Sequence, residues 1–231
     1  MKRVPMRTYI YAIAMVVVLL MLLALRQPAL EATNSAYEIP VLFVGILTTI
    51  DKYARRSLIR DCYLREIPPM VEVRFVVGSP KNEEEELRIA TEQRKHGDIV
   101  VLDMEENLDD GKTYHYFKWV AEHTASPFVL KTDDDVYLHL PNMVERIQML
   151  SETYGTSGVY FGRQVPGTGF MAGMGYVLSR DLVDFIAQDA YAASHIVGQE
   201  DGLVSSWLRR GDQVTHFVSE DKEVPPAHVA L

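Results

Sequence analysis

The sequence predicts a mixed α/β domain in which helices cover both faces of a mostly parallel central sheet. Apolar runs of strand length alternate with helix-like segments from residue 41 to the acidic triplet at residues 133–135, a pattern typical of parallel sheets covered on both faces. The chain has 231 residues, 48% of them hydrophobic, which is enough for one sizeable core. Cys62 is the only cysteine, so no disulfide can form within the chain, and the fold must depend on its apolar core and on bound ligands.

The charge of the chain restricts the class of partner. The formal net charge is −9, and Lys and Arg form no cluster larger than short pairs. Because nucleic-acid binding needs clustered cations that contact phosphates, we expect no nucleic-acid partner. A small or neutral partner fits this composition better.

An apolar run near the N-terminus predicts a membrane anchor. Residues 9–25 are apolar throughout, at the lower limit of length for a transmembrane helix. Lys2, Arg3 and Arg7 precede the run, which predicts a cytosolic N-terminus. A cleaved signal peptide is the alternative, but the run is longer than the usual apolar region of a signal, and no small-x-small site follows Leu25 directly. We therefore expect an uncleaved, single-pass type II anchor.

This anchor divides the chain into four parts. Residues 1–8 form a cytosolic tail, and residues 9–25 form the transmembrane signal-anchor. Residues 26–39 have little periodicity and form a short stem. Residues 40–231 then form the luminal domain.

The first part of the domain contains three predicted strand–helix steps. Apolar or alternating runs predict the strands, and amphipathic or capped segments predict the helices. In chain order these elements are 41–47, 53–60, 71–77, 82–96, 98–102 and 112–124. Thr48, Thr49 or Asp51 is expected to cap the first helix, and Gly97 to end the second.

The first helix carries three arginines, Arg55, Arg56 and Arg60. Such residues usually form a solvated helix face. In a protein that binds a diphosphate they can instead neutralise it, because the helix begins near the carboxyl end of the first strand.

An acidic triplet follows the next predicted strand. Pro127 precedes a short apolar run that ends in Asp133, Asp134 and Asp135. If the backbone stays extended, Asp133 and Asp135 project to the same side, and their oxygens suit magnesium or manganese. A solvated acidic loop or a helix cap is the alternative. The position favours a site, because ligands of open α/β sheets bind at the carboxyl ends of strands.

Further elements follow the triplet. Pro141 begins a helix with an apolar stripe, and strands are predicted at 159–162 and 174–178. The glycines between and within these strands do not follow the dinucleotide-binding pattern. They indicate either a loop that lets backbone approach a ligand or a simple turn. They are Gly167, Gly169, Gly173 and Gly175.

A second acidic site, Glu200-Asp201, heads the last predicted helix. Acids at a helix N-terminus are most often caps. A carboxylate there can also act as a general base if the fold brings it within reach of an attacking hydroxyl. The sequence leaves both interpretations open.

With both acidic sites identified, the chain resembles the β-1,3-galactosyltransferase and β-1,3-N-acetylglucosaminyltransferase family, the inverting Golgi enzymes related to Fringe. Matching segments occur in the family's order from about residue 41 to about residue 210. They are 55–60 (RRSLIR), 75–78 (FVVG), 96–100 (HGDIV), 112–113 (KT), 131–137 (KTDDDVY), 173–179 (GMGYVLS) and 200–201 (ED).

The resemblance implies a GT-A fold, a Golgi membrane location with a luminal catalytic domain, a UDP-sugar donor and dependence on manganese or magnesium. It implies that Asp135, with Asp133, takes the metal, and that Asp133 and Asp134 lie near the donor. It also implies that Asp201 is the catalytic base, with Glu200 beside it.

The matched segments supply further donor-binding candidates, which are Arg55, Arg60, Lys131, Gly173 and Gly175. The expected reaction transfers galactose or N-acetylglucosamine to a hydroxyl of a glycan on a glycoprotein or glycolipid, with a β-1,3 linkage as product. The alternatives are a nucleotide-sugar-binding pseudoenzyme of the same membrane and a metal-dependent hydrolase. The hydrolase lacks the expected set of histidines.

The chain departs from the family pattern at several positions. Cys62-Tyr63 replaces a Thr-Trp pair, the family's luminal cysteines are missing, and Gly202 follows the Glu-Asp pair where the family has valine. The family also continues further after this pair, to a histidine that completes the metal site. His216 or His228 is either a substitute for that histidine or an ordinary surface residue, and the domain is possibly shortened at its C-terminus.

Overall fold

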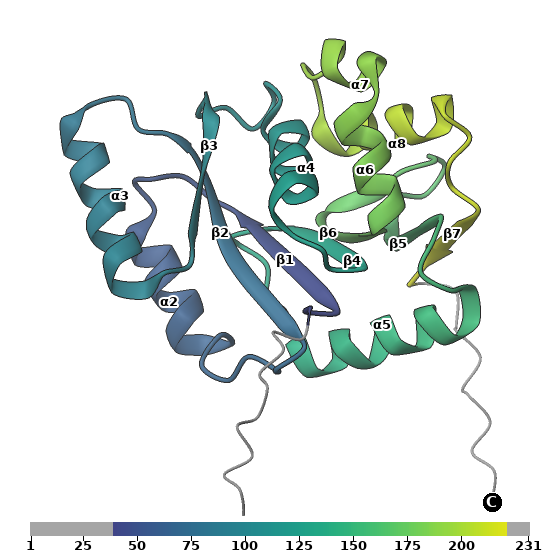
Figure 1. Cartoon of the computed structure of the whole chain (residues 1–231), viewed down its shortest axis with the longest axis horizontal. Coiled ribbons are helices and arrows are strands. Elements are labelled where there is room, and N and C mark those ends of the chain that lie inside the picture. Colours follow the sequence, from purple (N-terminus) through teal and green to yellow (C-terminus); the bar gives the residue numbers. More distant parts are fainter. Residues whose placement is uncertain (1–38, 221–231) are drawn as a thin grey trace, which may run out of the picture. The chain divides into compact units, whose positions relative to one another are not determined.

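A seven-stranded sheet carries a hydrophobic core on each face (Figure 1). The computed structural model describes residues 39–220, so the predicted tail, the predicted anchor and all but the last residue of the predicted stem lie outside the described part. Among residues 39–220, no helix combines the length and the hydropathy needed to cross a bilayer. The four-part division of the chain therefore stays a prediction.

Every strand and helix predicted from residue 41 onward is present. In chain order the elements are β1 (Leu42–Leu47), α2 (Tyr53–Cys62), β2 (Val71–Ser79), α3 (Glu83–His96), β3 (Ile99–Glu105), α4 (Lys112–His123), β4 (Phe128–Asp133), α5 (Leu140–Tyr154), β5 (Val159–Gln164), β6 (Met171–Ser179), α6 (Arg180–Gln188), α7 (Ala190–Ser194), α8 (Glu200–Arg210) and β7 (His216–Ser219). The sequence patterns did not predict α6, α7 and β7.

The sheet is mostly parallel, as predicted. Its strand order is β3-β2-β1-β4-β6-β5-β7. β1 runs parallel to β2 and β4, β2 to β3, and β5 to β7, whereas β6 is antiparallel to both of its neighbours. Leu47 at the end of β1 pairs with Asp133 at the end of β4. The acidic triplet therefore lies at the sheet edge where parallel strands present their carboxyl ends.

Helices cover both faces of the sheet. Apolar residues of α2, α3 and α5 pack on one face, and those of α4, α6, α7 and α8 pack on the other. Figure 1 shows how these helices are arranged around the sheet. β4 is buried along its length and contributes Phe128 and Leu130 to the first core and Val129 to the second. This arrangement is GT-A-like: a mixed α/β fold with a central sheet between two helical layers.

The ends of α3 follow the prediction, but the start of α2 does not. The side chain of Asn82 accepts a hydrogen bond from Glu85 N at 3.0 Å, and Gly97 ends the helix in the left-handed conformation (φ 69°). α2 instead begins after Lys52, without a side-chain cap. The expected caps have other partners, because the Thr48 hydroxyl donates to Asp134 and the Thr49 hydroxyl to Asp51.

The glycine-rich stretch is only partly a loop. Gly167 lies in the turn between β5 and β6 with φ 75°, but Gly173 and Gly175 belong to β6 itself. Extended pairing with β4 and β5 therefore replaces part of the expected loop.

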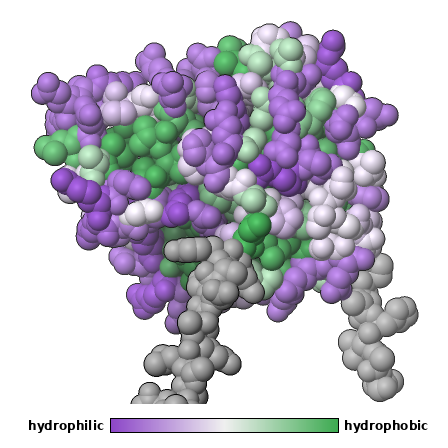
Figure 2. Space-filling view, in the orientation of Figure 1, coloured by the Kyte–Doolittle hydropathy of each residue, from purple (hydrophilic) through white to green (hydrophobic). Residues whose placement is uncertain are grey.

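The face of the molecule drawn in Figure 2 is mostly hydrophilic. A hydrophobic area lies on the left of that view, over α3 and β3, which carry the exposed Leu87 and Val101. The two acidic sites do not belong to this area.

Candidate active site

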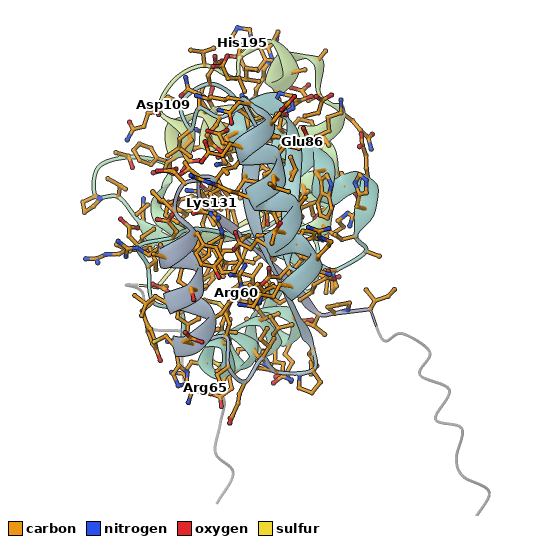
Figure 3. The ribbon with its side chains drawn as sticks, turned by 90° about the vertical axis from the view of Figure 1, so that its left-hand side faces the viewer. Arg60, Arg65, Glu86, Asp109, Lys131 and His195 are labelled. Atoms are coloured by element: carbon orange, nitrogen blue, oxygen red, sulfur yellow. The ribbon has the colours of Figure 1, made fainter. Side chains whose placement is uncertain are left out.

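Lys131 joins three elements at the edge of the sheet. It lies on β4, its side chain is fully buried, and it lies in the interior of the molecule (Figure 3). Its Nζ donates to Asp133 Oδ1 at 2.8 Å, to Gly173 O at 3.1 Å, and to the carboxylate of Glu200. One ammonium group thus connects β4, β6 and the first residue of α8.

Glu200 is paired from two sides. One carboxylate oxygen accepts from Lys131 and the other from the hydroxyl of Thr113 on α4. Burial acts to lower the pKa of Lys131, but the charges of Glu200 and Asp133 outweigh it, so that this pKa is raised and the lysine stays charged. Glu200 is therefore held in place by partners on two other elements, β4 and α4.

Asp201, the next residue, is in the opposite situation. Its Oδ1 is buried and has no hydrogen-bond partner among residues 39–220. Burial, followed by the negative charge of Glu200, raises the pKa of Asp201 from 3.8 to about 7. A carboxylate with a pKa near neutrality is well matched to accept a proton in general base catalysis.

Gly173 makes room for this carboxylate. A Cβ atom at position 173 would lie 2.6 Å from each oxygen of Asp201, closer than real Cβ atoms come to any neighbour. Glycine is thus required in β6 because α8 brings the Asp201 carboxylate against the strand. The sequence motif Gly-x-Gly at 173–175 contained this signal, although its partner was not predictable.

The three aspartates of the triplet have three different environments. Asp133 is bonded to Lys131, and Asp134 is buried and accepts from Thr48 Oγ1 at 2.6 Å and Lys52 Nζ at 3.2 Å. Asp135 is exposed. β4 ends at Asp133 and a turn follows, so the extended backbone needed to project Asp133 and Asp135 to one side does not continue through the triplet.

The triplet lines a pocket of about 190 Å³, here named the triplet pocket. Four carboxylates and two lysines line it, together with neutral groups from the end of β1. Its lining residues are Leu47, Thr48, Thr49, Lys52, Glu106, Leu108, Lys112, Asp133, Asp134 and Asp135. Sequence reasoning did not assign Lys52, Glu106 or Lys112 to the site, because they come from separate loops and helix ends.

Lys112 is part of the wall of this pocket. Its Nζ donates to Glu106 Oε1 at 2.6 Å and to the carbonyl of Thr48, and burial lowers its pKa. This ion pair fixes the segment before α4 against the end of β1.

A divalent cation fits the chemistry of the triplet, but the protein supplies few ligands. The carboxylates of Asp133 and Asp135 suit magnesium or manganese. Within residues 39–220, no group of three or more His, Cys, Asp or Glu residues is arranged to hold a metal ion. A metal held by these aspartates would therefore take its remaining ligands from a diphosphate and water.

His216 does not complete such a site. It pairs with Val159 at the beginning of β5, and its ring packs against Tyr154 with centroids 4.9 Å apart. Through β6 this register corresponds to the amino end of β4, opposite to Asp133. The suggested role of His216 as a metal ligand is therefore wrong on geometric grounds, and His228 lies outside the described residues.

The arginines of α2 are not brought to the triplet pocket. Arg55 is exposed to solvent. Arg60 donates to Asp98 Oδ2 and Glu92 Oε1, each at 2.7 Å, and its guanidinium lies over the ring of Phe75. Figure 3 shows Arg60 well away from Lys131. The predicted donor contact of Arg60 has no support here, because its charge is used between α2 and α3.

The fold and the site define a class of protein: a GT-A-like α/β protein with a carboxylate-rich pocket at the ends of its strands and a carboxylate of raised pKa, Asp201, at the start of α8. Residues 54–164 match the galactosyltransferase family model. This match covers slightly less than half of the chain and supports the family resemblance of its motifs. The domain and its relatives support a glycosyltransferase.

Curated relatives agree with this family. The chain is 28% identical over 210 residues to the β-1,3-galactosyltransferase pvg3 of Schizosaccharomyces pombe, covering 64% of this chain and 55% of that protein. It is 27% identical over 135 residues to the human lactosylceramide 1,3-N-acetyl-β-D-glucosaminyltransferase, covering 53% of this chain and 35% of that protein. The chain thus spans about half the length of the first relative and a third of the second.

A solved structure shares the fold. The crystal structure of S. aureus TarS superimposes with a TM-score of 0.50 at 18% identity, covering 78% of this chain and 35% of that chain. At this identity the likeness concerns the fold alone.

Proposed function

We propose that this protein is a metal-dependent inverting hexosyltransferase that moves galactose or N-acetylglucosamine from a UDP-sugar to a glycan hydroxyl, forming a β-1,3 linkage. The observation that carries the proposal is Asp201, a half-buried carboxylate with a pKa of about 7, next to the residue that Lys131 joins to Asp133 of the triplet pocket. The galactosyltransferase-family match and the β-1,3-transferase relatives support the reaction class.

The donor diphosphate is assigned to the triplet pocket. Lys52 lies at the rim of this pocket with 48% of its side chain exposed, and it can turn from Asp134 towards a phosphate. Asp133 and Asp135 would hold a manganese or magnesium ion together with the diphosphate. When bound, this ion neutralises negative charge on the departing UDP.

Asp201 acts on the acceptor. Its carboxylate takes the proton from the acceptor hydroxyl, while the acceptor oxygen forms a bond to the anomeric carbon of the sugar. The bond between that carbon and the diphosphate oxygen breaks, and its electron pair leaves with UDP. Attack from the face opposite to UDP inverts the anomeric configuration, and no covalent enzyme intermediate is needed.

Glu200 and Lys131 position these groups. Burial raises the pKa of Asp201, and the negative charge of the neighbouring Glu200 raises it further. Lys131 holds Asp133 at the pocket and Glu200 at the helix start. Both act through other residues and need not touch the substrate.

The test uses the full-length chain, purified in detergent, with manganese, a panel of UDP-sugars and neutral glycan acceptors. We expect transfer or slow hydrolysis of at least one UDP-hexose, with loss of activity when the metal is chelated. UDP binding without any turnover would instead favour the nucleotide-sugar-binding pseudoenzyme. Absence of UDP binding would exclude both.

The location belongs to the same proposal. The apolar run at residues 9–25 and the cations before it support a type II Golgi membrane protein with a luminal catalytic domain. In intact microsomes, the luminal domain should resist added protease, and it should be cleaved once detergent has dissolved the membrane. Cleavage in intact microsomes would contradict this orientation.

A further inference from the structure

A second pocket lies directly beyond the acidic triplet, on the sheet face covered by α5. Its volume is about 350 Å³, within the roughly 300–1,000 Å³ typical of small-molecule sites. The start of α5 forms one wall, and β5 and β6 form the other. We name it the arginine pocket after Arg146 and Arg163, which line it.

The arginine pocket is continuous with the candidate active site along the chain. Asp135 lines the triplet pocket, and the next residue, Val136, lines the arginine pocket. On β6, Gly173 faces Asp201, and the next residue, Met174, lines the arginine pocket. The arginine pocket therefore adjoins the turn that lines the triplet pocket, and it adjoins the strand on which Gly173 faces Asp201.

The charges of the two pockets differ in sign. Carboxylates outnumber lysines in the triplet pocket, whereas the arginine pocket has two guanidinium groups and one carboxylate, Glu220. Neither Arg146 nor Arg163 has a carboxylate within 4.0 Å in the described part of the chain. In a protein of net charge −9, such cations favour an anionic ligand.

Other groups of the arginine pocket suit a sugar. Tyr137 is 65% exposed at the rim, and its ring is held edge-on by Tyr63 with centroids 5.3 Å apart. Asn142 offers a side-chain amide, and the carboxylate of Glu220 can accept hydrogen bonds from sugar hydroxyl groups. Glu220 is fixed at the rim because its N–H donates to Gly162 O at 2.9 Å. A rigid aromatic ring beside polar groups is a common way to orient a polar ligand.

We propose that the arginine pocket binds the part of the glycan acceptor that lies beyond the reacting hydroxyl, and that it selects acceptors carrying an acidic group such as a phosphate ester. Arg146 and Arg163 contact the acidic group, and Tyr137 with Asn142 contacts the sugar. This inference rests on the proposed transferase function for its role, but its binding test does not.

The binding test measures calorimetric affinity of the full-length chain for galactose 6-phosphate, in the presence of saturating UDP and manganese. Galactose and inorganic phosphate serve as separate probes. We expect galactose 6-phosphate to bind at least tenfold more tightly than either. Replacing both arginines (Arg146→Gln with Arg163→Gln) should weaken galactose 6-phosphate binding at least tenfold and change galactose binding less than twofold. UDP affinity should stay the same.

Arg94→Gln, an exposed arginine on α3, is the control and should have no effect. Equal weakening by the control, displacement of galactose 6-phosphate by UDP, or equally tight binding of inorganic phosphate would each overturn the inference. A melting curve of each variant excludes loss of folding as the cause.

A kinetic test then separates this inference from the proposed function. In the transfer assay, the double arginine variant should raise the KM for an acidic acceptor at least tenfold and leave the KM for its neutral counterpart unchanged. If UDP binding and transfer are absent while arginine-dependent binding of galactose 6-phosphate persists, the transferase proposal fails and the anionic sugar site remains. If transfer is present but neither KM changes, the acceptor role of the pocket is wrong.

Discussion

Two clusters of buried charge in this molecule have opposite characters. The first, between α2 and α3, pairs Arg56 and Arg60 with Glu92, and Arg60 also with Asp98. Arg56 additionally donates to the carbonyls of Thr49 and Ile50. Burial acts to raise the pKa of Glu92, but hydrogen bonds from the two arginines lower it. Only Arg60 Nη1 is buried without a partner here.

The second cluster contains Lys131, Asp133, Glu200 and Asp201. Lys131 donates to both Asp133 and Glu200, but nothing in the described structure pairs with Asp201 Oδ1. The first cluster thus lowers the pKa of its buried acid, whereas the second raises the pKa of Asp201. A buried acid whose charge is balanced stabilises a fold, and one that is left unbalanced is available for proton transfer. The comparison predicts different consequences for the two clusters.

The largest expected effect is on catalysis in the second cluster. Asp201→Asn removes the base and should lower turnover by about 10²- to 10⁴-fold. The free energy of unfolding should stay constant or rise, because a poorly paired buried carboxyl is replaced by a neutral amide. Initial rates and urea denaturation measure the two effects. Asp109→Asn, an exposed acid, is the control, and a variant that kept most of its activity would exclude Asp201 as the base.

Substitutions in the first cluster should change the free energy of unfolding rather than the turnover. Arg56→Met leaves Glu92 with one partner and should lower the free energy of unfolding by about 3 kcal/mol. Turnover per folded molecule should not change. The neighbouring Arg55→Met replaces an exposed arginine and should alter stability by no more than about 0.5 kcal/mol. If Arg56→Met and Arg55→Met had the same free energy of unfolding, the first cluster would not stabilise the fold.

Crowding Asp201 should give an intermediate loss of activity. Gly173→Ala places a methyl group against the Asp201 carboxylate, which must move, and turnover should fall roughly 10- to 100-fold. Gly175→Ala on the same strand meets nothing closer than 3.6 Å and should have a smaller effect. Similar losses in both variants would show that strand geometry, rather than Asp201, is responsible.

The smallest expected effect is on the pH profile. With a pKa of about 7, Asp201 is a competent base only when deprotonated, so kcat/KM should fall about tenfold from pH 8 to pH 6. Stability should change in the opposite direction. Because the folded pKa lies above the unfolded value of 3.8, the folded protein binds the extra proton, and stability falls as pH rises from about 4 to 7. Asp201→Asn should remove that slope, and a slope that stayed unchanged would assign it to another group.

The sequence predicted the strands and helices other than α6, α7 and β7, because their apolar patterns are local. It also predicted that Asp133 and Asp201 belong to acidic sites, from their positions at a strand end and a helix start. It could not predict that Arg60 pairs with Asp98 or that Gly173 faces Asp201, because such contacts depend on how distant segments pack. Periodicity likewise gave no sign of Lys52 or Glu106, which lie at the pocket only through the loops that carry them.

The hydrogen bonds of Glu200 also have a consequence for the order in which the protein is made. Glu200 lies 69 residues after Lys131 and 87 after Thr113, its two partners. The chain up to the end of β4 contains four strands and three helices. These strands can pair, and the helices can pack on them, while α8 is still being synthesised. Until residue 200 emerges, the ammonium group of Lys131 lacks its main counter-charge. The four-stranded part of the sheet can therefore form early in synthesis, whereas the candidate site is completed only after α8 has left the ribosome.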